Sequence, residues 1–136
     1  MKRVNKNLNV SEEVTSFVCP LGATINMDGT SIHQAISAVF IAQAFGQDLT
    51  IADQLVIIVT ATLSSIGAAA VPGAGLIMLV IVLEAVGIDP QGLALIIAID
   101  RPLDMCRTIV NVTGDATVAS IVAYTEGENV KFNEDE

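Results

Sequence analysis

The sequence predicts an all-α membrane protein with a broken transmembrane helix, a re-entrant helical hairpin and a long transmembrane helix that carries one polar stripe. Its 136 residues are 52% hydrophobic and 15% charged, with a mean hydropathy of +0.65, whereas a soluble domain carries about 25% charged residues. The apolar middle of the chain is divided into short or interrupted runs, and such runs are typical of transporter binding sites. The charges gather at the two ends.

The composition also excludes one class of partner. The net charge is −9 and aromatic residues make up 4% of the chain, whereas nucleic-acid binding needs clustered Lys and Arg or an aromatic stacking surface. We therefore expect no nucleic-acid partner. The two cysteines, Cys19 and Cys106, form no metal-binding spacing and are expected to act as small hydrophobic residues.

The first expected helix is interrupted. Residues 1–13 form a polar lead-in, and residues 14–45 are long enough to span a bilayer but contain the polar cluster Asn26-Met27-Asp28-Gly29-Thr30. Unwound carbonyls beside a carboxylate suit a cation such as Na⁺. The alternative is a capped kink with Asp28 as the N-cap.

Residues 51–86 predict the re-entrant hairpin. The apolar runs 54–66 and 76–86 are each shorter than the ~20 residues that a spanning helix needs, and a Gly- and Pro-rich break at 67–75 joins them. Non-helical backbone at membrane depth survives only inside protein or along a wet cavity. Thr50 is expected to cap the first arm.

Residues 93–125 predict one long helix with Pro102 near its start, followed by an acidic tail at 126–136. Five polar residues in this helix, at spacings of four, three, four and four, share an arc of roughly 80°. They are Asp100, Asp104, Arg107, Asn111 and Asp115. Since a charge in hydrocarbon costs about 2.5–3.5 kcal/mol or more, this stripe is expected to face protein, water or ligand, unless the segment is an amphipathic helix of a soluble bundle.

Two residues of this stripe suggest a ligand. The planar guanidinium of Arg107 matches a carboxylate. Asp104, one turn earlier, is suited either to a ligand ammonium group or to neutralising Arg107 itself. Asp100 has a rival role as an N-cap before Pro102.

Three segments, 21–30, 64–75 and 104–115, together resemble the dicarboxylate/amino acid:cation symporter family, the sodium-coupled glutamate/aspartate and dicarboxylate transporters. The resemblance covers about residues 10–125. It implies that residues 14–125 are the C-terminal part of a transport domain, with the seventh transmembrane helix, the second re-entrant hairpin and the eighth transmembrane helix. We therefore expect a fragment without the N-terminal transporter helices and the serine-rich first hairpin.

The resemblance also implies site residues. Arg107 would bind the side-chain carboxylate of the substrate and Asp104 its amino group. The full implied substrate set is Thr30, Ala70, Val71, Pro72, Gly73, Ala74, Gly75, Asp104, Arg107, Thr108 and Asn111. Sodium sites would be formed by side-chain or backbone oxygens of Gly22, Thr24, Asn26, Asp28, Ser65, Ile66, Ala68, Asn111 and Asp115.

The expected function is Na⁺-coupled symport of acidic amino acids, aspartate or glutamate, by the transporter of which this chain is a fragment. The resemblance implies a multi-pass protein of the cell membrane that forms a homotrimer and performs no enzymatic chemistry. One alternative is a Na⁺- or H⁺-coupled C4-dicarboxylate symporter, although the acid at Asp104 would repel a dicarboxylate that lacks an ammonium group. Another is a small helical membrane-interaction protein without transport activity.

Overall fold

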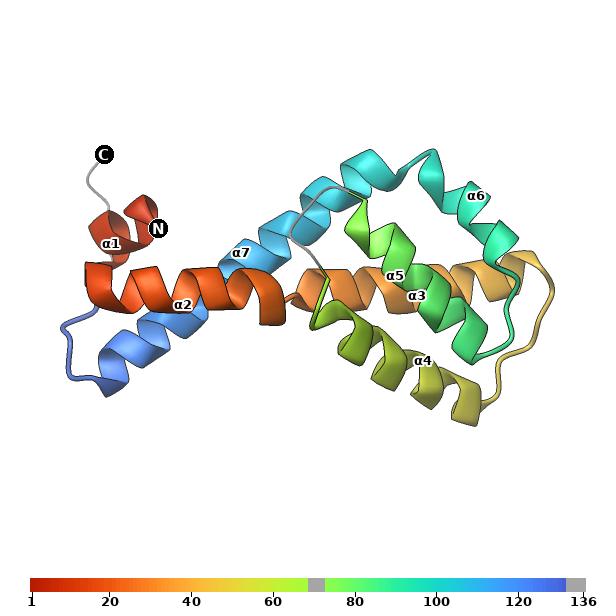
Figure 1. Ribbon diagram of the computed structural model, residues 1–136, viewed down its shortest axis with the longest axis horizontal. Coiled ribbons are helices and arrows are strands. Elements are labelled where there is room, and N and C mark those ends of the chain that lie inside the picture. Colours follow the sequence, from red (N-terminus) through yellow and green to blue (C-terminus); the bar gives the residue numbers. More distant parts are fainter. Residues whose placement is uncertain (69–72, 132–136) are drawn as a thin grey trace.

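The protein is all-helical in the part of the chain that the structure describes, residues 1–68 and 73–131. In this computed structural model, which is elongated, α2 and α3 follow the long axis and α7 crosses them obliquely (Figure 1). The α-helices in chain order are α1 (Lys2–Leu8), α2 (Glu12–Ile25), α3 (Asp28–Ala44), α4 (Ile51–Ser65), α5 (Ala74–Ala85), α6 (Leu93–Ile97) and α7 (Asp100–Thr125). A 3-10 turn at Pro90–Gly92 precedes α6. The predicted all-α class is confirmed.

The segment expected as a broken helix consists of α2 and α3. Helix α2 starts at the N-cap Ser11, whose side chain accepts a hydrogen bond from the Val14 N–H, and ends before Asn26. The Asn26 N–H donates to the Gly22 carbonyl at 2.8 Å. The N-cap of α3 is Met27 and not Asp28, which corrects the capped-kink alternative and leaves the Asp28 carboxylate exposed.

Helices α4 and α5 pack against α3 and against each other. The start of α4 is a capping box, in which Thr50 accepts from the Asp53 N–H and the Asp53 side chain accepts from the Thr50 N–H, as the sequence predicts for Thr50. The main core lies between α3, α4, α5 and α6. Its buried apolar residues are Ala38, Ile41, Ala42, Ile57, Ala61, Leu79, Val82, Leu83, Ile88 and Ile96.

The single helix expected over residues 93–125 is instead divided. Helix α6 ends at Ile97, and a turn at residues 98–99 precedes α7. Pro102 explains the division, because its nitrogen has no hydrogen to donate and its ring would clash with the carbonyl of Ala98 in a continuous helix. By starting at Asp100, α7 places Pro102 in its first turn, where backbone N–H groups need no helical partner.

Helix α1 and the end of α7 lie together at the far end of the molecule from this core (Figure 1). A smaller apolar cluster joins α1, α2 and α7 there, and it consists of Val4, Val10, Val18, Ala119 and Ala123. The Ser11 N–H donates to a Glu128 carboxylate oxygen at 2.9 Å, and hydrogen bonds from Ser11 lower the pKa of the Glu128 carboxyl. The Lys131 N–H donates to the Leu8 carbonyl at 3.2 Å.

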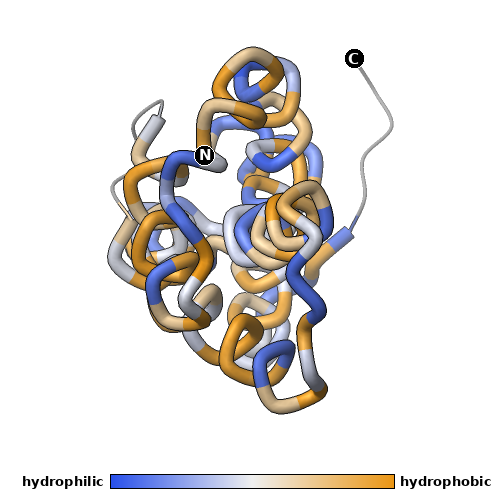
Figure 2. The backbone as a smooth tube through the Cα atoms, turned by 90° about the vertical axis from the view of Figure 1, so that its right-hand side faces the viewer, coloured by the Kyte–Doolittle hydropathy of each residue, from blue (hydrophilic) through white to orange (hydrophobic). Residues whose placement is uncertain are grey.

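Large apolar side chains are also exposed along the longer helices. Examples are Phe17, Ile36, Ile51, Ile77 and Ile109, and Figure 2 shows that hydrophobic stretches recur around the outside of the helical arrangement. Within residues 1–68 and 73–131, none of the helices is both long enough and apolar enough to cross a membrane.

Candidate functional site

Arg107 on α7 is almost fully buried, with 5% of its side chain exposed. Its Nη2 donates a 3.0 Å hydrogen bond to Oδ1 of Asp100 and lies 3.0 Å from Oδ1 of Asp104. A buried charge is strongly destabilising without a partner, and these two carboxylates provide partners. The N-cap of α7 is Ile99, so Asp100 is an ion-pair partner and not the cap. The Asp104–Arg107 pair that we kept as an alternative is present.

Two nitrogens of this guanidinium, which together carry three N–H groups, have no hydrogen-bond partner among residues 1–68 and 73–131. They are Nε and Nη1 of Arg107, and both are buried. Gly75, in the first turn of α5, packs so closely against Nη1 that a side chain at position 75 would overlap it. A Cβ placed there would also lie 3.7 Å from Cγ2 of Thr30 on α3. Residues from α3, α5 and α7 therefore surround a guanidinium that retains donors for an anion.

Asn111 connects α7 to the start of α3. Its side-chain oxygen accepts a hydrogen bond from the Gly29 N–H at 2.8 Å, and its amide nitrogen donates to the Thr30 hydroxyl at 3.2 Å. Gly29 itself packs against the backbone carbonyl of Arg107, leaving no room for a Cβ. Four sequence-predicted substrate residues, Thr30, Gly75, Arg107 and Asn111, are thus brought together.

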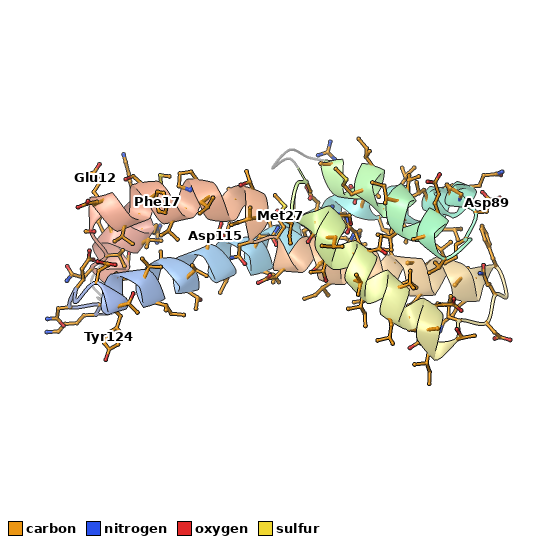
Figure 3. The ribbon with its side chains drawn as sticks, turned by 60° about the horizontal axis from the view of Figure 1, so that its bottom comes forward. Glu12, Phe17, Met27, Asp89, Asp115 and Tyr124 are labelled. Atoms are coloured by element: carbon orange, nitrogen blue, oxygen red, sulfur yellow. The ribbon has the colours of Figure 1, made fainter. Side chains whose placement is uncertain are left out.

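A second polar cluster lies where α2 meets α3, and Figure 3 shows Asp115 of α7 beside this junction. The Asn26 side-chain amide donates to Oδ1 of Asp115 at 3.0 Å, and Gly22 packs directly against the same carboxylate. A Cβ added at Gly114 would lie 2.9 Å from the Asn26 amide nitrogen and 3.4 Å from an Asp28 carboxylate oxygen. The Asn26 amide and the carboxylates of Asp28 on α3 and Asp115 on α7 therefore gather at this junction.

The remaining predicted residues lie elsewhere. Thr108 is exposed on α7, where its hydroxyl donates to the Asp104 carbonyl at 2.8 Å, and Thr24 is exposed near the end of α2. Three predicted sodium ligands lie at or just after the end of α4, namely Ser65, Ile66 and Ala68. Gly73 and Ala74 lie at the start of α5, with Gly73 at a φ of 85°, whereas Ala70, Val71 and Pro72 fall outside the described residues.

Comparison with known proteins identifies the family. Residues 1–125 match the model of the sodium:dicarboxylate symporter family, which is 125 of 136 residues. The chain belongs to this family. The resemblance noted from the three sequence segments is therefore confirmed.

Several excitatory amino acid transporters are similar to this member of the symporter family. An excitatory amino acid transporter of Onchocerca volvulus is 50% identical over 121 residues, which is 89% of this chain and 25% of that protein. Excitatory amino acid transporter 3 of Mus musculus is 56% identical over 113 residues, 83% of this chain and 22% of that protein. The human transporter of the same name is 54% identical over 117 residues. The chain thus spans about a quarter of the length of these relatives.

Sequence analysis missed one residue at the site. Gln34 on α3 is completely buried and contacts both α4 and α5 through hydrogen bonds. A signal was present, because an amide within an apolar helix needs partners when it is buried. The neighbouring His33 is half-buried, and its ring nitrogens have no hydrogen-bond partner in the part of the chain that the structure describes. It lines a mostly apolar groove of about 380 Å³ between α3, α6 and α7.

Proposed function

We propose that this chain is the C-terminal part of the transport domain of a secondary active transporter that carries aspartate or glutamate together with Na⁺. Membership of the sodium:dicarboxylate symporter family supports coupling to sodium. The names of the similar transporters support an amino acid as the substrate. Substrate and ion would bind without covalent chemistry.

The observation that carries the substrate proposal is the buried Arg107 with two unpartnered donors. A carboxylate of an acidic amino acid would bind to these donors in the space between α3, α5 and α7. The hydroxyl of Thr30 and the amide of Asn111 lie close enough to each other, at 3.2 Å, to orient a ligand from the same side. The small Gly75 allows the start of α5 to approach the guanidinium closely, where a larger residue would overlap it.

Asp104 supports an amino acid over a plain dicarboxylate. With an amino acid bound, its carboxylate would accept a charge-assisted hydrogen bond from the ligand ammonium group. One observation favours the runner-up, a C4-dicarboxylate symporter: the charge of Asp104 is already paired with Arg107 at 3.0 Å. Asp104 can fill both roles only if it exchanges Arg107 for the ammonium group when substrate binds.

The co-transported Na⁺ would bind near the junction of α2, α3 and α7. The oxygens of Asn26, Asp28, Asn111 and Asp115, with backbone carbonyls such as that of Gly22, are the hard ligands that an alkali cation prefers. The proximity of Asn26 and Asp115 supports this site, although in the structure it is the Asn26 amide nitrogen that lies 3.0 Å from Oδ1 of Asp115, so the amide would turn its oxygen toward a bound cation. Further sodium ligands would come from Thr24 and from the end of α4.

The location we propose is the cell membrane. Helices α4 and α5 would form the two arms of a re-entrant hairpin, because each has 15 residues or fewer, which is too short to span a bilayer. The exposed apolar side chains would contact lipid and the N-terminal helices of the complete transporter, which would assemble as a homotrimer.

The test is a chimera of mouse excitatory amino acid transporter 3 in which this chain replaces the matching 113-residue segment. We expect uptake of labelled aspartate that depends on the Na⁺ gradient. Arg107→Lys should reduce this uptake at least about tenfold, because an ammonium group cannot replace the planar two-donor fork. Arg101→Lys on the exposed side of α7 is the matched control. Uptake that is independent of Na⁺, or equal in the two variants, would contradict the proposal.

A further inference from the structure

Gln34 is a completely buried amide on α3, and it lies between the two helices of the hairpin. The Ser64 hydroxyl, in the last turn of α4, donates to its side-chain oxygen at 2.8 Å. Its side-chain nitrogen faces the Gly75 carbonyl in the first turn of α5 at 3.4 Å. A single side chain of α3 is therefore hydrogen-bonded to α4 near its end and to α5 near its beginning.

The chemistry of the partners fixes the orientation of this amide. The Gly75 carbonyl can only accept, so the nitrogen of Gln34 must face it. The oxygen of Gln34 is then turned toward Ser64, whose hydroxyl can donate. An amide supplies a donor and an acceptor at once, and an apolar side chain of the same length supplies neither.

Gly75 links this amide to the guanidinium of Arg107. Its carbonyl faces Gln34, while its Cα packs against Nη1 of Arg107, where a side chain would overlap the guanidinium. The position of the first turn of α5 therefore determines how much space remains beside the unpartnered donors of Arg107. A small outward shift of α5 would widen that space.

We propose that Gln34 is a positioning residue that ties both arms of the hairpin to α3 and so sets how closely Gly75 approaches Arg107. The inference rests on the proposed function in one respect, namely that the space beside Arg107 holds the substrate. Loss of Gln34 then weakens substrate binding by releasing the start of α5, while the transport step itself is little affected.

The first test measures the hairpin directly in the full 136-residue chain. Spin labels are attached at L63C on α4 and I77C on α5, both of which replace exposed residues, after Cys19 and Cys106 are changed to Ser. Gln34→Met should lengthen and broaden the distance distribution between the labels. Gln43→Met makes the same change at an exposed position of α3 and should leave the distribution unchanged. Equal distributions for the two variants overturn the inference.

The second test uses the chimera described above and separates binding from turnover. Gln34→Met should raise the half-saturating aspartate concentration about tenfold with little loss of maximal rate, because both hydrogen bonds are lost. Ser64→Ala removes the bond between α4 and Gln34, together with the bond from the Ser64 hydroxyl to the Ala61 carbonyl within α4, but keeps the bond from Gln34 to Gly75. It should raise the half-saturating aspartate concentration by about threefold. Ser64→Ala still tests the inference if the Gln34→Met protein fails to fold.

The outcomes distinguish this inference from the proposed function. A fall in maximal rate at an unchanged half-saturating concentration would show a merely structural role for Gln34 and overturn the inference. If the chimera with the unmodified chain takes up no aspartate, that result counts against the proposed function. It also overturns the expected effect of Gln34 on the affinity for aspartate. The label distances test the positioning of the hairpin independently of transport.

Discussion

At the scale of single residues, three glycines allow the charged helix α7 to approach its neighbours. Gly22 packs against the Asp115 carboxylate, Gly29 against the Arg107 carbonyl and Gly75 against the Arg107 guanidinium. Each is a position where a Cβ would collide with α7. Gly73 differs, because its φ of 85° is a backbone conformation that other residues adopt reluctantly. Two kinds of constraint therefore act on glycines only two residues apart.

The charged site residues were largely predictable at this scale, and the Asp104–Arg107 pair was one of the alternatives, but the pairing of Asp100 with Arg107 was not foreseen. The helical spacing of Asp100, Asp104 and Arg107 predicts a shared face, and the structure pairs all three. Spacing alone could not decide whether Asp100 caps the helix, since that depends on where the helix begins. Gln34 was missed because its two partners belong to α4 and α5, and local periodicity contains no information on such contacts.

Asp104→Ser should change the substrate preference of the chimera. The variant removes the proposed partner of the ligand ammonium group. The loss of a buried charged partner costs roughly 2–5 kcal/mol, and because the Asp104 side chain is 28% exposed we expect the lower end, about thirtyfold in affinity. Aspartate binding should therefore weaken, while succinate binding weakens less or improves. Competition binding of the two ligands at saturating Na⁺ measures this preference.

Asp89→Ser is a suitable control, because it removes an exposed acid from the turn before α6. If the unmodified chimera already binds succinate as tightly as aspartate, the dicarboxylate alternative is the better one. Asp104 is then explained by its ion pair with Arg107 alone.

At the scale of elements, the start of a helix could be predicted from the local sequence where a capping residue is present. Thr50 and Asp53 form the expected capping box of α4, because both partners lie within one turn of the sequence. The start of α7 was misplaced, because the apolar run continues from α6 through the turn at 98–99 and conceals the break. Only the steric effect of Pro102 reveals it.

The contact between the start of α2 and the segment after α7 should depend on pH. Hydrogen bonds from Ser11 lower the pKa of Glu128, so they favour its charged form. Their contribution to stability is complete above the ordinary carboxyl pKa and is lost as the pH falls through the lowered pKa. Hydrogen exchange of the Ser11 N–H, corrected for its intrinsic pH dependence, should therefore accelerate in acid.

Glu128→Gln should remove this acid-induced acceleration, because an amide does not titrate. Glu126→Gln changes an exposed acid two residues earlier and should preserve it. Ser11 exchange that responds to acid equally in the two variants would disprove the assignment to Glu128.

At the scale of the whole molecule, the arrangement brings several of the proposed substrate and ion residues to the surface of α7 that faces α2, α3 and α5. Asp115 contacts the junction of α2 and α3, and Arg107 lies two turns earlier beside Gly75 of α5. Sequence segments far apart in the chain, around residues 26, 75 and 111, therefore meet at one helix. The family resemblance predicted this set of residues. The relative positions of these residues depend on the packing of α3 between the hairpin and α7.

The last prediction concerns the activity of this chain by itself. Reconstituted into vesicles, the 136-residue chain should show no aspartate uptake driven by a Na⁺ gradient, whereas the chimera should show it under the same conditions. The chain spans about a quarter of the length of its relatives, and exposed residues such as Met105, Ile109 and Val112 leave one side of α7 uncovered. The Asp104 side chain of the α7 stripe is 28% exposed, and a charge that contacts hydrocarbon costs at least about 2.5–3.5 kcal/mol, so this part of the stripe needs further helices to separate it from lipid. Gradient-driven uptake by the isolated chain would mean that copies of the chain supply that cover to one another.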